Sequence, residues 1–463
     1  MRAVRIAFWA IALLATIWRL SLYGDPRLAI ATTDTQSYID ASRALLLSPE
    51  SFTGRRLFTT NVVYKAISAG SNCGSVAVSM PAIGKEGRRE IQPCFEVVAA
   101  LQSFLSIGAW LWLAFVVSRR LTEPVAQLLA AVVLLLFAFT PQIAEWDSVM
   151  SSESLSISLF ILSLGFLIEI AFRLPSASSG ASAPPTSFYV LWFVSFALWL
   201  YVRDANLFAI PATLMIMIPL SISRSFSNKR PILVLAILLI ALFILGLQTS
   251  RQSPRWQPSI RHSLETFVFP YPARVQFLSA HFSMPAPNSA DHAAWFEERA
   301  PTAFSAFLVL HPGFIATTII DNWIVFIHSY EQPYYQLGAA NTTSPFLGFG
   351  ELLHPASGVF YLVDTIVLIA LCAAVCIGAG RHPLPWAWIL IWLYLAAAST
   401  LVVSFFGDTD GVMRHIFPSL EMFRLLMWLS FLILVDTYLR RSHWISSTTA
   451  TMATSDAAGG TQA

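Results

Sequence analysis

Long apolar runs alternate with polar stretches along most of the chain. A membrane-spanning helix needs about 20 predominantly apolar residues, and ten segments approach or exceed that length. These segments are residues 4–22, 96–118, 123–141, 150–172, 187–202, 205–221, 231–249, 357–379, 384–406 and 416–438. Two of them, 187–202 and 205–221, are short and could also form one hairpin of tilted or half-spanning helices. The pattern predicts an all-α polytopic membrane protein, a bundle of about ten transmembrane helices.

Basic residues at the ends of these segments predict the orientation, because short cytoplasmic loops carry an excess of Lys and Arg. One set of ends holds nearly all of them: Arg2, Arg5, Arg119, Arg120, Arg173, Arg224, Lys229, Arg230, Arg381, Arg440 and Arg441. The opposite short loops hold only Arg203 and Arg414. If all ten segments cross the membrane, every Lys and Arg of the first set lies on the same side. We therefore expect both termini in the cytoplasm and the long segments 23–95 and 250–356 outside.

The composition narrows the class of protein further. Charged residues are 12% and hydrophobic residues 56% of the 463 positions, whereas a soluble domain carries about 25% charged residues. An ordinary soluble domain is therefore excluded. The net charge of +2 is too small to favour nucleic acid. The sequence contains no Gly-rich phosphate loop, which argues against an ATP-driven pump or an enzyme that uses nucleotide sugars.

Most of the chain, residues 1–445, is expected to form one membrane domain. Its first 18 residues begin with basic residues as a signal peptide does, but a long polar spacer follows, so we expect an uncleaved first helix. The small and polar residues 174–186 predict a disordered cytoplasmic linker. Residues 446–463 have the same character and predict a disordered cytoplasmic tail.

The two long outer segments differ in character. Residues 23–95 are polar and contain Cys73 and Cys94, which could form a disulfide in an oxidising periplasm. Residues 250–356 are rich in aromatic residues and proline. This composition predicts amphipathic helices lying at the membrane interface, with a re-entrant segment as the alternative.

Charged side chains gather in the predicted outer loops. They include Asp34, Asp40, Arg55, Arg56, Lys65, Glu145, Asp147, Glu153, Arg203, Asp204, Asp408, Asp410, Arg414 and His415. Any one of them could be a solvated loop charge, and Asp40 and Arg43 could simply pair on the surface of a helix. Together, carboxylates and cations from four separate loops suit a phosphorylated, lipid-tethered substrate and a hydroxyl that must lose its proton.

Four motifs within residues 33–426 resemble those of the C superfamily of glycosyltransferases (GT-C). TDTQSYIDASRALL is similar to the signature of the first outer loop, and MSSESLSISLF is similar to an acidic motif that opens a later helix. YVRDANLFAIP resembles an Arg-Pro-x-x-Leu turn, with Asp204 in the usual proline position. MRHIFPSLEMFRLL resembles an Arg-Tyr-x-x-Pro motif, with His415 in place of the aromatic residue. Within the superfamily, the motifs most resemble those of the bacterial protein O-mannosyltransferase and lipid A aminoarabinose transferase group. The substitutions at Asp204 and His415 leave the identity of the acceptor open.

The resemblance implies an inverting hexosyl- or pentosyltransferase that moves a sugar from a polyprenyl-phosphate carrier to an acceptor hydroxyl. Asp34 would be the general base, and Glu153 would orient hydroxyl groups or share a divalent cation, Mg or Mn, with Asp34. The cations available for the lipid phosphate would be Arg55, Arg56, Lys65, Arg203 and Arg414. Further contacts with the acceptor or the sugar are expected from Tyr38, Asp147 and His415.

The implied partners are the lipid-linked donor, membrane lipids and an acceptor that could be a lipid, a glycan or a protein, with no nucleic acid. The expected location is the bacterial inner membrane, with the active site facing the periplasm or the exterior. Two alternatives stay open: a polymerase or ligase that uses lipid-linked glycan, and a secondary transporter or flippase. A transporter would be expected to carry mid-helix charges and an inverted repeat, and the sequence has few such charges and no repeat.

Overall fold

Helices dominate the computed structural model of this chain. The structure describes residues 2–32, 34–43, 45–46, 48–68, 78–81, 88–92, 94–174, 184–222, 229–287, 289–328, 334, 345–376 and 383–459. Apart from helices it contains one small antiparallel sheet, in which β1 (Val78–Pro81) pairs with β2 (Arg88–Ile91). Seven helical segments of the described chain are long and apolar enough to cross a membrane without a sharp bend. The prediction of an all-α polytopic membrane protein is thereby confirmed.

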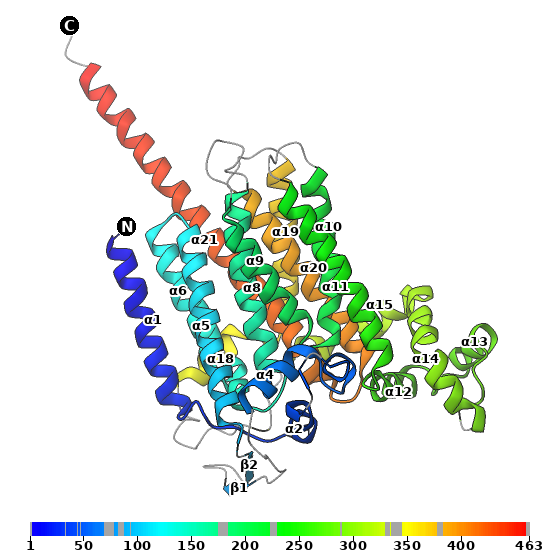
Figure 1. Cartoon of the computed structure of the whole chain (residues 1–463). Coiled ribbons are helices and arrows are strands. Elements are labelled where there is room, and N and C mark those ends of the chain that lie inside the picture. Colours follow the sequence, from blue (N-terminus) through cyan, green and yellow to red (C-terminus); the bar gives the residue numbers. More distant parts are fainter. Residues whose placement is uncertain are drawn as a thin grey trace.

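Ten helices of the described chain correspond to the ten apolar segments of the sequence (Figure 1). They are α1 (Arg2–Tyr23), α5 (Glu96–Arg120), α6 (Pro124–Phe139), α8 (Glu153–Arg173), α9 (Thr186–Leu200), α10 (Ala209–Ile222), α11 (Arg230–Gln252), α19 (Val359–Cys376), α20 (Pro383–Gly407) and α21 (Val412–Gly459). The helix α10 reaches full spanning length together with η3 (Asp204–Phe208), which precedes it. The helices α9 and α19 are shorter, and α6 reaches full length only with its bent continuation.

A proline causes the bend after α6. The chain continues through α7 (Pro141–Ala144) and η1 (Glu145–Ser148) at an angle of 53° to α6. Pro141 has no backbone N–H to donate to the preceding turn, so the helix cannot continue straight through it. The bend brings the chain into the short turn that precedes α8.

The helices of the bundle pack closely against one another at glycine positions. Gly165 of α8 lies directly against the Trp112 indole of α5, and a side chain at this position would collide with the ring. Gly246 of α11 admits the Leu207 side chain of η3 in the same way. Because such interiors have little free volume, residues at the helix ends are held in defined places.

The two ends of the bundle differ (Figure 1). Both chain termini lie at one end, which agrees with the ten crossings predicted from the sequence, and we call it the terminal end. The opposite end carries α2 (Thr35–Arg43), α3 (Glu50–Thr53), α4 (Phe58–Ser68) and the small sheet, and we call it the site end. The assignment of the terminal end to the cytoplasm remains a prediction.

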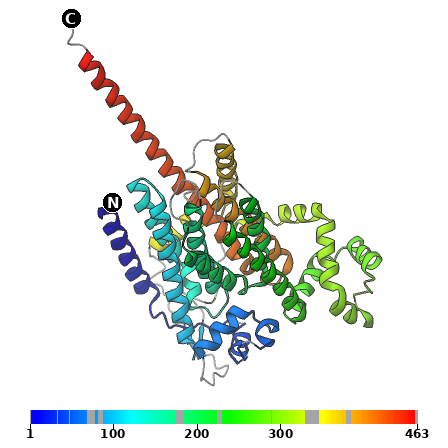
Figure 2. The same cartoon turned by 45° about the horizontal axis from the view of Figure 1, so that its top comes forward.

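Helices within segment 250–356 form an arm that projects sideways from the bundle (Figures 1 and 2). The arm consists of α12 (Trp256–Phe267), α13 (Pro272–Phe282), α14 (Ala290–Leu310) and α15 (Pro312–Asp321), and α14 meets α15 at 85°. Two further helices return to the bundle: α16 (Trp323–Ile327) packs on α21, and α18 (Pro345–Leu353) packs on α6 and α7. The prediction of helices here is confirmed, whereas their depth in the membrane remains a prediction.

Three further expectations from the sequence have different outcomes. The helix α21 continues through residues 446–459, and the expected disorder of the tail remains a prediction. Extending an existing helix avoids the cost of nucleation, so even a small, polar segment can continue it. Cys73 lies outside the described residues, so its disulfide with Cys94 remains a prediction, and residues 175–183 of the expected linker also lie outside.

Candidate active site

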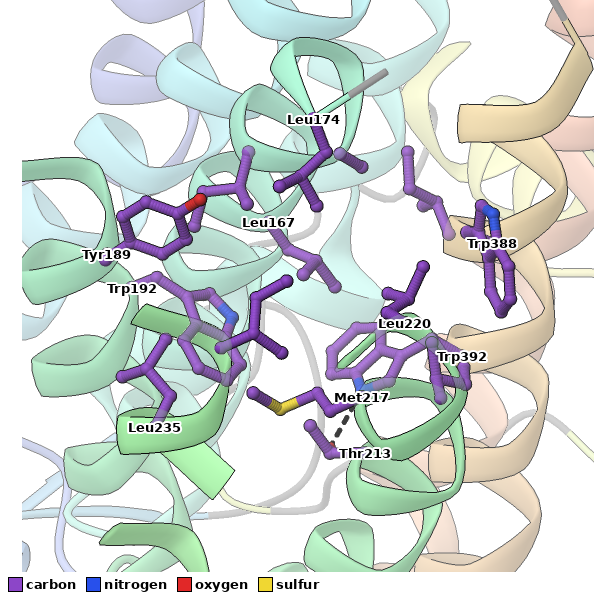
Figure 3. A pocket seen from close by; sticks show the side chains of 15 residues that line it. Leu167, Leu174, Tyr189, Trp192, Thr213, Met217, Leu220, Leu235, Trp388 and Trp392 are labelled. Carbon is purple, nitrogen blue, oxygen red and sulfur yellow. Dashed lines mark hydrogen bonds between the residues drawn. The ribbon is translucent and has the colours of Figure 1, made fainter. Parts of the chain in front are cut away.

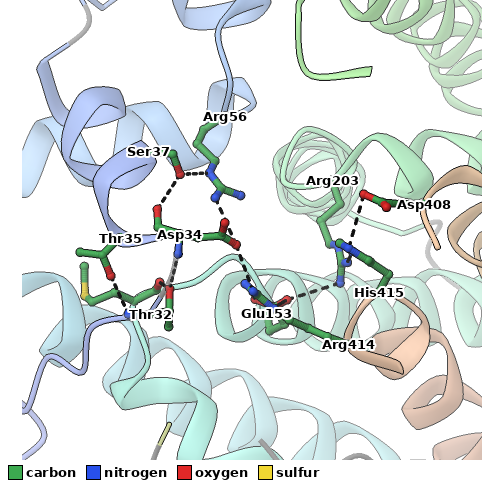
Figure 4. A network of polar contacts seen from close by, with 11 residues as sticks. Thr32, Asp34, Thr35, Ser37, Arg56, Glu153, Arg203, Asp408, Arg414 and His415 are labelled. Atoms are coloured by element: carbon green, nitrogen blue, oxygen red, sulfur yellow. Dashed lines mark hydrogen bonds and ion pairs between the residues drawn. The ribbon is translucent and has the colours of Figure 1, made fainter. Parts of the chain in front are cut away.

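Five charged side chains from distant parts of the chain meet at the site end of the bundle (Figure 4). Asp34 lies just before α2, and Arg56 lies between α3 and α4. Glu153 is the first residue of α8, Arg203 precedes η3, and Arg414 lies in the first turn of α21. All five were candidates from the sequence, and we call them the site cluster.

A backbone bridge fixes the position of Asp34. The Ile30 N–H donates to the Ser148 carbonyl at 2.8 Å, and the Met150 N–H donates to the Ile30 carbonyl at 2.9 Å. Asp34 follows Ile30 closely, and Glu153 follows Met150 closely at the start of α8. The bridge therefore brings two carboxylates from separate loops to the same place.

Arg414 joins these two carboxylates. Its Nε donates to Glu153 Oε1 at 2.7 Å and its Nη2 to Oε2 at 3.4 Å, while its Nη1 donates to Asp34 Oδ2 at 3.0 Å. The Glu153 side chain is 1% exposed, whereas the Asp34 side chain is 41% exposed. A two-pronged contact between a guanidinium and a carboxylate fixes both groups. Glu153 therefore holds Arg414 in place, and Asp34 remains accessible.

Arg56 is the second cation at Asp34. Its Nη2 lies 3.4 Å from Asp34 Oδ2, its Nε donates to the Ser37 hydroxyl at 2.7 Å, and its guanidinium lies 4.0 Å from the centre of the Tyr38 ring. Burial would lower the pKa of Arg56, but Tyr38 and Asp34 outweigh this effect and raise it, so the group stays charged. Tyr38 is fully buried, which raises the pKa of its phenol, and its hydroxyl has no hydrogen-bond partner among the described residues. The Tyr38 ring therefore holds the Arg56 guanidinium by stacking rather than by a hydrogen bond.

Arg203 connects the cluster to a histidine and a further carboxylate. Its Nη2 lies 2.9 Å from His415 Nδ1, and the His415 Nε2 lies 3.6 Å from Asp408 Oδ2. Because a guanidinium can only donate, Nδ1 of His415 must accept and Nε2 must carry the proton toward Asp408. Asp408 also accepts from the Ser259 hydroxyl at 2.8 Å and lies 3.2 Å from His262 Nδ1, both on α12.

The charges of the site cluster favour an anion. Three guanidiniums meet two carboxylates, which leaves one positive charge in excess. Arg203 Nη1 is buried and lies 4.0 Å from Glu153 Oε1. It has no hydrogen-bond partner among the described residues. A phosphate oxygen could satisfy such a donor, and guanidinium geometry matches phosphate well.

Three residues expected at the site lie apart from the cluster. Asp147 is buried and forms an ion pair with Arg19 of α1, so it stabilises helix packing. Arg55 is exposed, although its neighbour in sequence belongs to the cluster. The Lys65 Nζ donates to the Arg43 carbonyl at 3.3 Å in an exposed position. Charged residues that the sequence grouped together thus take different positions in the tertiary structure.

A divalent cation shared by Asp34 and Glu153 does not fit the observed arrangement. The Arg414 guanidinium occupies the space between the two carboxylates, with hydrogen bonds to both. Within the described part of the chain, no three His, Cys, Asp or Glu side chains are grouped as metal ligands. The arrangement is that of carboxylates which orient a guanidinium.

Other residues at the site end were not singled out from the sequence. Arg255 pairs with both carboxylate oxygens of Asp204, at 2.7 and 3.1 Å, and its Nη1 donates to the Phe52 carbonyl at 3.0 Å and to the Gly54 carbonyl at 3.2 Å. These contacts tie the start of α12 to the loop that carries Arg56. Ser259 and His262 are one turn apart, a spacing that puts them on one helix face, but nothing in the sequence pairs them with Asp408.

Comparisons with known proteins give limited similarity. No protein-family model matches the sequence, and no curated protein matches it. Among solved structures, the oligosaccharyltransferase AglB of Archaeoglobus fulgidus, in complex with an inhibitory peptide and a dolichol-phosphate, is 12% identical with a TM-score of 0.42, over 95% of this chain and 52% of that one. The apo form of the Archaeoglobus fulgidus oligosaccharyltransferase is 10% identical with a TM-score of 0.34, over the same shares. The chain spans about half the length of each.

Proposed function

We propose that this protein is an inverting glycosyltransferase of the GT-C type. It takes a hexose or pentose from a polyprenyl-phosphate carrier and passes it to an acceptor hydroxyl on the non-cytoplasmic side of a bacterial inner membrane. One observation carries the proposal: an accessible carboxylate and three guanidiniums from separate loops converge at one end of a membrane-spanning bundle. The four motifs that resemble those of the superfamily supply four of the five residues of the site cluster, all except Arg56.

The reaction assigns a role to each charge. The acceptor oxygen forms a bond with the anomeric carbon, and the bond from that carbon to the phosphate oxygen breaks on the opposite side, which inverts the configuration. The acceptor proton passes to Asp34, and the leaving polyprenyl phosphate takes the electron pair. Its developing charge needs preorganised cations, and Arg56, Arg203 and Arg414 are those that the cluster offers.

Donor binding would make Asp34 available as a base. Both guanidinium contacts of Asp34 use Oδ2. An arriving phosphate would compete with this oxygen for Arg56 and Arg414. The carboxylate would be released when the donor is in place, so that proton removal is coupled to donor binding.

Glu153 acts in this scheme as a positioning residue. It is buried and bound to Arg414 by two hydrogen bonds, so it contacts neither the solvent nor an arriving acceptor. Its negative charge keeps Arg414 at the start of α21, and it also faces Arg203 at 4.0 Å. The buried carboxylate thereby sets the spacing of two phosphate ligands.

The test is sugar transfer by the purified full chain in lipid nanodiscs. A panel of labelled polyprenyl-phosphate sugars is offered with envelope lipids, glycans and proteins as acceptors. We expect label in one acceptor class, release of polyprenyl phosphate in equal amount, and an inverted linkage by NMR.

Consumption of only diphosphate-linked oligosaccharides would replace the proposal with a polymerase or ligase. Movement of the labelled lipid across the bilayer without bond cleavage would replace it with a flippase. A comparison of envelope glycans and lipids between a deletion strain and wild type, by mass spectrometry, would then identify the acceptor.

A further inference from the structure

Four polar residues lie on one side of α12, the first helix of the arm. Arg255 directly precedes the helix with a helical backbone conformation, and Ser259, His262 and Thr266 follow within the helix. Residues three or four positions apart share one side of a helix. We call these four residues the α12 polar face. Each of them makes a hydrogen-bonding contact with a turn at the site end of the bundle.

Arg255 connects two segments that carry cations of the site cluster. Its Nε and Nη2 pair with the two carboxylate oxygens of Asp204, the residue next to Arg203. Its Nη1 donates to two backbone carbonyls in the segment just before Arg56. The Arg255 side chain is 8% exposed, so water competes little for these bonds. One guanidinium thus links the loop of Arg56 to the turn of Arg203.

The other three residues of the polar face contact the turn that precedes α21. The Ser259 hydroxyl donates to Asp408 Oδ2 at 2.8 Å, and His262 Nδ1 lies 3.2 Å from Oδ1 of the same carboxylate. The Thr266 and Thr409 hydroxyls are 2.9 Å apart. From this turn the chain enters the start of α21, where the third guanidinium of the site cluster lies. The α12 polar face therefore contacts the segments of all three guanidiniums.

The other sides of α12 make apolar contacts with the arm and with α20. The Trp256 and Phe296 ring centres are 5.5 Å apart, and the Arg261 guanidinium lies 5.3 Å from the centre of the same Phe296 ring on α14. The Phe267 ring is buried, with its centre 5.3 Å from that of Phe406 on α20. These contacts attach α12 to its neighbours without help from the polar face.

Apolar packing attaches helices but does not fix the direction of a polar group, because the hydrophobic effect is non-directional. The terminal end of the bundle illustrates this difference (Figure 3). Apolar side chains such as Leu167, Leu174 and Leu220 line a cavity there, and within its wall Trp392 Nε1 donates to the Thr213 hydroxyl at 2.9 Å. The α12 polar face instead presents a row of hydrogen bonds, which specify where each partner lies.

We propose that the α12 polar face positions the three guanidiniums of the donor phosphate site, with Arg255 as its main positioning residue. The inference rests on the proposed function, because it concerns the site where the lipid phosphate would bind. Arg255 acts through Asp204 and through the backbone before Arg56, without touching the donor. Stabilisation of a leaving phosphate requires preorganised cations. A displacement of about 1 Å in such a site can lower a rate by about 100-fold.

Binding of polyprenyl phosphate to the purified full chain tests the proposal, together with the donor KM, kcat and thermal unfolding. Arg255→Gln keeps a long polar side chain but removes the charge and the fork. We expect its Kd for polyprenyl phosphate and its KM for the donor to rise by about ten-fold or more. A variant that had only lost folded protein would show a lower kcat with unchanged Kd and KM. Arg261→Gln is the matched control, since it makes the same change on the side of α12 that faces α14, and it should bind as wild type does.

Hydrogen exchange of the unliganded protein gives a readout that does not depend on the donor. The segment around Arg56 and the start of η3 should exchange faster in Arg255→Gln and at the wild-type rate in Arg261→Gln. The double variant Ser259→Ala, His262→Ala removes the contacts to Asp408 at the other end of the polar face. It should raise the Kd for polyprenyl phosphate by about three-fold or more, and it decides the question if Arg255→Gln does not fold.

Two kinds of failure can be told apart. If the wild type binds polyprenyl phosphate, unchanged Kd and KM in the polar-face variants or equal losses in Arg261→Gln would overturn the inference and leave the proposed function standing. If the wild type binds no polyprenyl phosphate, the proposed function itself is refuted. Faster exchange confined to Arg255→Gln would in that case assign a purely structural role to the polar face, which overturns the inference as well.

Discussion

Replacing Asp34 with Asn isolates the proposed chemistry from the fold. Asn keeps the size of the side chain but removes its capacity to accept a proton. The Asp34 side chain is 41% exposed, and its two ion pairs lie at 3.0 and 3.4 Å. Ion pairs of this exposure typically contribute up to about 1 kcal/mol to folding. Loss of a general base lowers a rate by about 100- to 10,000-fold, or about 3–5 kcal/mol of barrier. The effect on turnover should therefore exceed the effect on stability.

The assay measures initial rates of sugar transfer at saturating donor, together with donor binding and thermal unfolding of the same preparation. We expect Asp34→Asn to lose at least two orders of magnitude in turnover while it binds donor and unfolds nearly as wild type does. Asp40→Asn is the matched control, since Asp40 is on the adjoining helix, 53% exposed and 3.9 Å from Arg43. It should transfer sugar at the wild-type rate.

The alternative role for Asp34 is a helix cap. A capping carboxylate accepts from the first backbone N–H groups of its helix, and its loss costs about 0.5–2 kcal/mol of stability. Here the carboxylate contacts Arg56 and Arg414 instead. Folded Asp34→Asn protein with near-normal turnover, or with a loss no larger than that of Asp40→Asn, would refute the catalytic role.

Three other predictions address the phosphate site, the packing and the topology. Arg414→Ala should weaken donor binding and turnover together, and Arg414→Lys should recover only part of the loss because the forked geometry is gone; full recovery in transfer assays would contradict a bidentate phosphate contact. Asp147→Ala should leave Arg19 buried without its partner and lower the free energy of unfolding by about 3–5 kcal/mol, while the turnover of the folded fraction, measured after thermal challenge, stays normal. A cysteine introduced by Ser179→Cys should resist membrane-impermeant labelling of intact cells, and labelling from outside would reverse the assigned topology.

Parts of the candidate site were predictable because their residues belong to local motifs. Asp34 and Glu153 each stand at the start of a helix that follows a polar turn, and Arg414 opens the last apolar run. Such positions follow from sequence because an apolar segment of spanning length puts its end residues at the membrane boundary, and Asp34 follows the first such segment while Glu153 and Arg414 begin later ones. Their mutual contacts did not follow: Arg414 and Asp34 are separated by 380 residues, and no local pattern pairs them.

The sequence by itself determined the ten apolar helices, because hydrophobicity over about 20 residues is a local property that the bilayer imposes on each segment. It did not give the end of α21, which continues to Gly459. Only the tertiary structure decided which charges meet. It brought Arg56 to Asp34 but left the adjacent Arg55 exposed, and it buried Asp147 against the first helix. The physical reason is that a charged side chain takes its partner from whichever element packs beside it. That neighbour depends on how all the helices fit together, which is a property of the whole bundle rather than of any segment.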